Sequence, residues 1–253
     1  MKSVVVTGAS TGIGWGCVKV LTGKGFHVFG SVRKQADAER LQKEFGASFT
    51  PLIFVIANPG PLLHLDIAAF RQQMEVNVTG QLIVTQAFAP LLGATPDAKS
   101  KERGRICMMS SVGGKVASPF LGPYSASKFA LEGLSESLRR ELLIYGVDVI
   151  IIAPGAIATP IWDKADALDV SRYANTPYKT SLDLVKKYMV GLGQKGLPPE
   201  RIGETVHTAL TTPNPKTRYI VTPEPLTNWL GNNLPKRMLD NTIAKRLGLT
   251  RQF

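Results

Sequence analysis

A glycine-rich turn near the start of the chain constrains the fold more than any other feature. Ser3–Thr7 is a β-branched run that predicts a buried strand, and Gly12–Lys24 has the apolar spacing of a helix. Glycines between them permit a tight turn and let backbone N–H groups approach a pyrophosphate at the helix N-terminus. This context favours nucleotide binding over an ordinary strand-to-helix turn. The candidate cofactor-binding residues are Gly8, Ser10, Thr11, Gly12, Ile13 and Gly14.

Strand-like and helix-like segments alternate along the rest of the chain. Further strands are predicted at His27–Val32, Phe49–Ile56, Arg105–Met109, Val147–Ala153 and Arg218–Val221, and helices at Ala36–Phe45, Asp66–Leu92, Gly122–Tyr145 and Pro199–Leu210. This alternation predicts an α/β protein with a Rossmann-like, doubly wound parallel sheet in three layers. The length of 253 residues suits one domain, 1–253. Residues 156–197 lack a clear period and are either a substrate lid or a surface excursion, and 223–253 form a basic C-terminal tail.

Composition narrows the classes of partner. The net charge is +11, but the basic residues are dispersed, so neither nucleic acid nor an anionic membrane is predicted as a partner. No apolar run is long enough for a spanning helix. We expect Cys17 and Cys107 to be buried free thiols, and with no signal peptide evident the expected location is the cytoplasm. The histidines stand far apart, and no metal site is predicted.

The end of the second predicted strand bears on the choice of cofactor. A carboxylate there would accept a hydrogen bond from the ribose 2′-hydroxyl and select NAD. Val32 stands at about that place and Arg33 follows it. A guanidinium can pair with a 2′-phosphate, so NADP(H) is favoured over NAD(H). The alternative is that Arg33 and Lys34 are exposed loop charges.

Tyr124 and Lys128 are candidate catalytic residues. They lie four residues apart in a predicted helix, so both side chains share one face. A free tyrosine is a poor base at neutral pH, but a nearby ammonium favours the phenolate and lowers the pKa of the phenol. Tyr124 could then exchange a proton with an alcohol or an alkoxide. The alternative is a pair on the helix surface.

Together these motifs resemble the short-chain dehydrogenase/reductase family, over nearly the whole chain. In that family a serine at a strand end bonds the reacting oxygen, and Ser111 matches it better than Ser110. The resemblance implies that Asn77 holds a relay water and that Lys128 also contacts the nicotinamide ribose. It assigns the nicotinamide to the turn that contains Pro154, Gly155, Ile157 and Thr159.

The resemblance also suggests the substrate and the assembly. The segment Gly122–Leu142 is similar to the retinol and hydroxysteroid dehydrogenase branch, which implies an apolar, steroid- or retinoid-like alcohol or ketone. Relatives often form homo-oligomers through two long helices. The predicted function is an NADP(H)-dependent oxidoreductase that transfers a hydride to or from such a small molecule. The alternative is a non-catalytic nucleotide-binding relative; a nucleic-acid binder is a third hypothesis, which would require salt-dependent binding.

One segment departs from the family pattern. After Phe54 the chain runs directly to the next helix, where the family has a helix and a further strand. Roughly thirty to forty residues are absent, judged against a whole crossover unit. In the family order that strand lies centrally beside the first, so its loss would leave ladder groups unpaired. Either the sequence omits residues of the natural molecule, or the protein is a truncated variant that binds cofactor poorly. A long Cα gap near Phe54–Ile56 would indicate omission.

Overall fold

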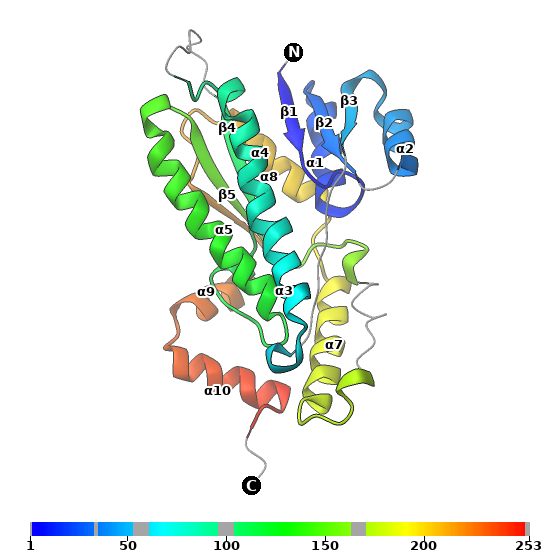
Figure 1. Cartoon of the computed structure of the whole chain (residues 1–253), viewed down its shortest axis with the longest axis vertical. Helices are drawn as coiled ribbons and strands as arrows, with labels where there is room; N and C mark the ends of the chain where they lie inside the picture. Colours follow the sequence, from blue (N-terminus) through cyan, green and yellow to red (C-terminus); the bar gives the residue numbers. More distant parts are fainter. Residues whose placement is uncertain (1, 33–34, 53–60, 96–103, 163–170, 251–253) are drawn as a thin grey trace.

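The fold rests on two parallel sheets. The structure, a computed structural model, describes residues 2–32, 35–52, 61–95, 104–162 and 171–250. One sheet has the order β1–β2–β3 and the other β4–β5–β6 (Figure 1). Their strands are β1 (Ser3–Val6), β2 (His27–Ser31), β3 (Phe49–Leu52), β4 (Arg105–Met109), β5 (Asp148–Pro154) and β6 (Arg218–Val221). Each described strand lies where the sequence predicts one.

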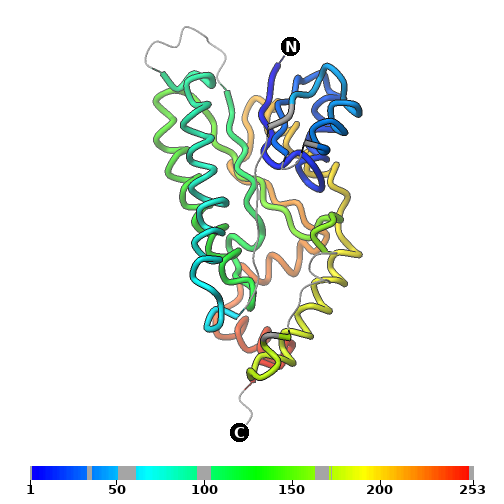
Figure 2. The backbone as a smooth tube through the Cα atoms, turned by 45° about the vertical axis from the view of Figure 1, so that its right-hand side comes forward, coloured from blue at the N-terminus to red at the C-terminus, as the bar shows by residue number. Residues whose placement is uncertain are grey.

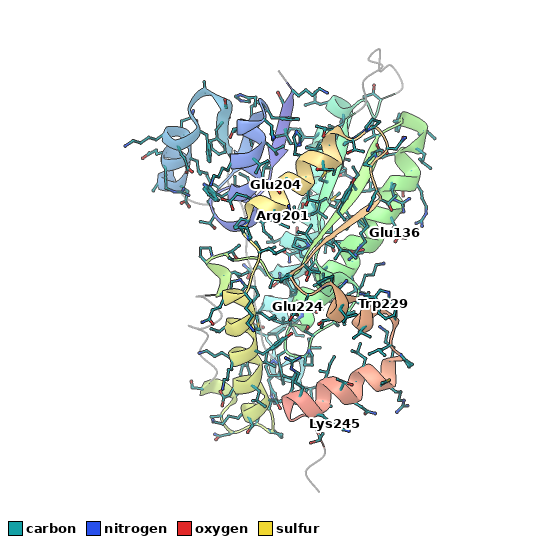
Figure 3. The ribbon with its side chains drawn as sticks, turned by 180° about the vertical axis from the view of Figure 1, so that it is seen from behind. Glu136, Arg201, Glu204, Glu224, Trp229 and Lys245 are labelled. Atoms are coloured by element: carbon teal, nitrogen blue, oxygen red, sulfur yellow. The ribbon has the colours of Figure 1, made fainter. Side chains whose placement is uncertain are left out.

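One hydrophobic core includes residues of both sheets. Strand β5 is buried along all but its first residue, as expected for a strand covered on both faces. Ile150 and Ile152 from β5 join a cluster with Val18 of helix α1 (Gly12–Gly23) and Ile202 of helix α8 (Glu200–Thr211). Figure 3 shows α8, marked by Arg201 and Glu204, lying between the two sheets.

The crossing of α1 and α8 depends on two glycines. A Cβ atom on Gly203 would lie 2.5 Å from the carbonyl oxygen of Gly16, and one on Gly16 would lie 2.5 Å from that of Pro199. The two helix backbones are therefore in direct contact, which only a residue without a side chain permits. Helix α2 (Gln35–Phe45) lies beside β3 at the edge of the first sheet (Figure 1).

Two long helical segments flank the second sheet. The predicted helix Asp66–Leu92 is present but irregular: α3 (Ile67–Met74), a π-helical turn (Glu75–Thr79), α4 (Gly80–Phe88) and a 3-10 turn (Ala89–Leu92). Helix α5 (Gly122–Glu141) ends in a 3-10 turn, Leu142–Tyr145. Figure 1 shows both segments running alongside β4 and β5.

Helices gather beyond the carboxyl ends of the second sheet's strands. The segment 156–197, predicted without regular structure, contains a 3-10 turn (Ser171–Tyr173) and helix α7 (Lys179–Gln194). The tail folds into α9 (Pro225–Asn233) and α10 (Lys236–Leu247). The Arg246 guanidinium lies 4.5 Å from the Tyr188 ring centre and joins α10 to α7. Figure 2 shows the backbones of these two helices close together near the C-terminus. The sequence did not predict α7, because Gly191 and Gly193 interrupt the apolar spacing of its last turns.

The division into two sheets corresponds to the departure from the family pattern. We predicted one sheet lacking a helix–strand unit; in the described part of the chain, no ladder pairs β1 with β4. These are the strands that a central strand would separate. The segment Phe54–Ile56 lies outside the described residues. A search of the described residues finds no helix that could span a membrane.

Candidate active site

Tyr124 and Lys128 lie on the first two turns of α5. Pro123 favours the start of the helix, because it lacks an N–H and its φ suits the first turn. Both side chains are partly buried. The Lys128 ammonium donates to the carbonyl oxygen of Met109, the last residue of β4, at 2.8 Å. It also lies 5.8 Å from the centre of the Tyr124 ring.

Ser111 meets Tyr124 from the other side. It directly follows β4 and caps a 3-10 turn, and its hydroxyl oxygen accepts the Gly113 N–H at 3.0 Å. The single proton of this hydroxyl can go to the carbonyl oxygen of Pro154, 3.3 Å away, or to the phenol oxygen of Tyr124, whose pKa it then lowers. The neighbouring Ser110 hydroxyl is buried and has no partner among the described residues. The structure therefore brings Ser111, rather than Ser110, to the phenol.

Burial dominates the electrostatics of the pair. It raises the pKa of Tyr124, and the hydrogen bond from Ser111 lowers that pKa in part. Burial also lowers the pKa of Lys128 to about 8. The causes of the shift at Tyr124 are burial and the Ser111 hydroxyl, so the effect of Lys128 on this pKa stays a prediction.

Asn77 reaches the same helix through an intermediate residue. It lies in the π-helical turn, and π-turns inside α-helices are frequent at functional sites. Its Nδ2 donates to the Ser127 hydroxyl at 3.0 Å, and that hydroxyl donates to the carbonyl oxygen of Tyr124 at 2.8 Å. The sequence did not point to Ser127, since a serine between Tyr124 and Lys128 carries no signal by itself.

The glycine-rich turn has a shape that fits a dinucleotide. Gly8 and Gly12 have φ angles of 72° and 58°, which favour glycine. A Cβ atom on Gly14 would lie 1.9 Å from the carbonyl oxygen of Gly8, so the turn closes tightly on α1. Thr11 precedes the helix without a side-chain cap, and no acidic residue lies in the first turn. The N-terminal dipole of α1 is thus available to an anion such as a pyrophosphate.

The turn after β5 lies against this glycine-rich turn. A Cβ atom on Gly12 would be 3.0 Å from Cγ2 of Thr159. Pro154 ends β5, and the Gly155 N–H donates to the carbonyl oxygen of Val221. Ile157 packs in the core and forms a bridge with Leu197. The segment predicted to bind the pyrophosphate and the segment predicted to bind the nicotinamide are thus adjacent.

Arg40 is a residue that the sequence analysis missed. The predicted phosphate ligand Arg33 lies outside the described residues, whereas Arg40 on α2 donates from Nη2 to the carbonyl oxygen of Ser10. It also forms ion pairs with Asp37 at 3.6 Å and Glu44 at 3.4 Å. The sequence offered only the helical spacing of Arg40 and Glu44, which is typical of a solvated surface.

Comparisons with known proteins agree with this geometry. The family model described as short chain dehydrogenase matches residues 55–168. An NADPH-dependent 3-dehydrocapnine reductase of Ornithobacterium rhinotracheale is 36% identical over 98% of each chain. Mouse 17-beta-hydroxysteroid dehydrogenase type 1 is 36% identical over 64% of this chain and 46% of its own length. A short-chain dehydrogenase/reductase structure from Burkholderia phymatum, in complex with NAD, superposes with a TM-score of 0.73 at 18% identity and covers 95% of each chain.

The alignment lengths bear on the missing unit. The alignment with the Ornithobacterium reductase extends over 279 positions, although this chain has 253 residues. An Escherichia coli oxidoreductase, 30% identical, aligns over 276 positions with 96% of this chain and 94% of its own. Both relatives therefore contain residues that have no counterpart here, as the sequence analysis predicts.

Proposed function

This chain belongs to the short-chain dehydrogenase/reductase family, and from that premise we propose that it transfers a hydride between NADP(H) and a secondary alcohol or ketone at Ser111, Tyr124 and Lys128. The observation that carries the proposal is that three groups converge: a Cβ atom on Gly113 would lie 3.4 Å from both the Ser111 hydroxyl oxygen and the Tyr124 ring, and the Lys128 ammonium lies 5.8 Å from the centre of that ring. A hydrogen-bond donor and a proton carrier directed at the same place suit a carbonyl oxygen that becomes an alkoxide.

The proposal assigns a role to each of these residues and to Asn77. Bound nicotinamide supplies the hydride donor or acceptor. During reduction, the Ser111 hydroxyl donates a hydrogen bond to the substrate oxygen and the Tyr124 phenol gives it a proton; during alcohol oxidation the phenolate takes the proton back. Burial lowers the pKa of Lys128 to about 8, and in its protonated form Lys128 stabilises the Tyr124 phenolate. Lys128 also contacts the nicotinamide ribose. Asn77 anchors the water that replenishes the proton.

The cofactor preference follows from charge at the end of β2. Val32 is buried and Arg33 follows it, so the position that selects NAD through a carboxylate has none. A guanidinium there pairs with a 2′-phosphate. The relative named as NADPH-dependent, similar over 98% of this chain, supports NADP(H). The Gly8–Gly14 turn would hold the pyrophosphate, and the Pro154–Thr159 turn the nicotinamide.

An apolar substrate suits the surroundings of Tyr124. Leu62 lies over Gly122, since a Cβ atom there would be 2.5 Å from Cδ2 of Leu62. Phe120 packs edge-on against Tyr178, with ring centres 5.7 Å apart, and Tyr178 against His64 at 6.0 Å. These rings come from the segments before α3, α5 and α7. The similarity to a hydroxysteroid dehydrogenase supports the same substrate class.

The test is cofactor-dependent turnover with secondary alcohols and ketones, comparing NADPH with NADH. Tyr124→Phe should lower kcat about 10²- to 10⁴-fold, the usual contribution of acid–base catalysis, while NADPH fluorescence titration shows unchanged binding. Tyr145→Phe, in the 3-10 turn that follows α5, is the matched control and should keep full activity. Wild-type turnover by Tyr124→Phe would refute the mechanism.

In the described residues no ladder joins β1 to β4, and this favours a second candidate, a relative that binds nucleotide without catalysis. Without a central strand the floor of the adenosine site is incomplete in the described residues. The same titration separates the two functions, because this candidate binds NADPH and turns over no substrate in the panel.

A further inference from the structure

A buried ion pair lies directly behind the candidate active site. Glu132 on α5 has only 3% of its side chain exposed, and Arg218 on β6 has 21%. Arg218 Nε lies 3.2 Å from Oε1 and 3.1 Å from Oε2 of Glu132, and its Nη2 lies 3.1 Å from Oε1. This is two-pronged recognition of a carboxylate by a guanidinium, which fixes direction as well as distance.

The pair connects the elements that carry the proposed catalytic residues. Tyr124, Lys128 and Glu132 follow one another at four-residue intervals, so they form one stripe on α5. Arg218 Nη2 also donates to the carbonyl oxygen of Ser111 at 3.4 Å. One guanidinium therefore joins α5 to residues 111–115, which we call the serine turn. Figure 3 labels Glu136, on the next turn of α5, and helps to locate this stripe from behind.

The serine turn has little freedom to move on its own. A Cβ atom on Gly114 would lie 3.0 Å from Cγ of Glu132 and 3.1 Å from the carbonyl oxygen of Lys128. Lys115 Nζ lies 3.8 Å from Oε2 of Glu132 and supplies a second, more exposed cation. The turn is thus packed on α5 and held there by charge at two adjacent points.

A buried ion pair is weak support for stability, because desolvation offsets much of the attraction. The geometry of this pair is a better guide to its role, because Arg218 bonds both Glu132 on α5 and the carbonyl oxygen of Ser111. We propose that Arg218 and Glu132 are positioning residues, which hold the Ser111 hydroxyl against the Tyr124 phenol. The inference rests on the proposed function, because it concerns the same site. Neither residue contacts the reacting atoms.

The chain offers a matched control on the same sheet. Arg105 lies at the opposite end of β4, is 18% exposed, and pairs with Asp148 at 3.4 Å. Its guanidinium also donates to the carbonyl oxygens of Ala209, Thr212 and Pro213. Arg105→Gln therefore removes a comparable set of interactions without touching the serine turn.

Steady-state kinetics test the role. Arg218→Gln and Glu132→Gln should each lower kcat by about tenfold to a hundredfold, the loss expected from misplacing a reacting group by ~1 Å, with KM for NADPH unchanged. Arg218→Lys should not restore kcat, because one ammonium cannot bond both the carboxylate and the Ser111 carbonyl. Arg105→Gln should lower the thermal midpoint similarly but keep kcat. Equal kcat losses in Arg218→Gln and Arg105→Gln would overturn the proposal.

Hydrogen exchange separates this inference from the proposed function and needs no turnover. The N–H groups of Gly113 and Gly114 bond the Ser111 hydroxyl and carbonyl. Exchange in peptides covering 111–115 should accelerate in Arg218→Gln, and in folded Arg218→Lys, but not in Arg105→Gln. An inactive wild type with this pattern would refute the proposed function and retain the positioning role. Unchanged exchange in 111–115 would refute the positioning role, whatever the activity.

Discussion

The hydroxyl of Ser111 and the ring of Tyr124 meet at Gly113, where an added Cβ atom would lie 3.4 Å from each, and this hydroxyl lowers the pKa of the Tyr124 phenol, which burial raises. Ser111 follows a strand and Tyr124 lies in the first turn of a helix, so the contact exists only in the folded chain. Its partners on each side, Pro154 and Gly113, fix the serine hydroxyl. Ser111 therefore fixes the orientation of the Tyr124 phenol and lowers its pKa.

Removing the Ser111 hydroxyl should change both rate and pH dependence. Ser111→Ala should lower kcat roughly 10²- to 10³-fold, the usual effect of losing one donor to a developing oxyanion. The pKa of Tyr124 should rise, so the reduction rate, which needs the protonated phenol, should persist to higher pH, and oxidation should require higher pH. Ser110→Ala is the control, since that hydroxyl has no partner in the described residues. Identical pH profiles for Ser111→Ala and wild type would contradict the assignment.

Replacing Asn77 should lower kcat more than the loss of its hydrogen bond to Ser127 alone. Asn77→Leu and Ser127→Ala both remove the hydrogen bond between these residues. If Asn77 also anchors a relay water, Asn77→Leu should lower kcat further than Ser127→Ala does. The ratio of kcat in H₂O to kcat in D₂O should then also differ between the two variants. The measurement is kcat for both variants in H₂O and D₂O. Equal values would leave Asn77 with a structural role alone.

Lys128 should make stability depend on pH in one window. Burial lowers its pKa from 10.5 to about 8, so between these values the unfolded chain binds more protons than the folded one. Stability must then rise with pH across that window and be lost as pH falls toward 8. The thiols of Cys17 and Cys107 titrate in the same region in the unfolded chain. They are present in wild type and in Lys128→Met alike, so their contribution cancels in the difference between the two proteins. Urea unfolding should show the advantage of wild type over Lys128→Met growing from pH 8 to 10. A flat difference would contradict the lowered pKa.

Arg33 and Arg40 should affect cofactor binding in different ways. Arg40 bonds the backbone of Ser10 in the glycine-rich turn, so Arg40→Gln should weaken NADPH and NADH alike. Arg33→Gln should weaken NADPH alone, because only NADPH carries the 2′-phosphate. Fluorescence titration of both cofactors checks this. A loss confined to NADPH in Arg40→Gln would instead make Arg40 a phosphate ligand.

The two cysteines should be unreactive in the folded protein. Burial raises the pKa of Cys17 and of Cys107 to about 12, and the thiolate is the reactive form. Iodoacetamide at pH 8 should therefore label neither thiol until urea unfolds the chain. Mass spectrometry of both samples gives the extent of labelling. Modification of the native protein at the rate of a free thiol would show that these sites open.

Much of the site could be predicted from short-range sequence patterns. The Gly8–Gly14 turn, the buried run of β5 and the four-residue spacing of Tyr124 and Lys128 are local, so the amino-acid order specifies them. The sequence also showed that the connection after Phe54 is shorter than the family pattern. Helix α7 was missed, because its glycines weaken the helical period while packing decides its structure.

What the sequence by itself determined is therefore the kind of fold and the residues that we propose carry its chemistry. The tertiary structure alone decided which of those residues meet. Arg40 bonds the glycine-rich turn, Asn77 acts through Ser127, and Arg218 joins Glu132 to Ser111. It also divided the strands into two sheets that share a core through α1 and α8. The physical reason is that such contacts join residues far apart in the chain, and only packing of whole elements sets their distances and the burial that shifts the pKa of Tyr124.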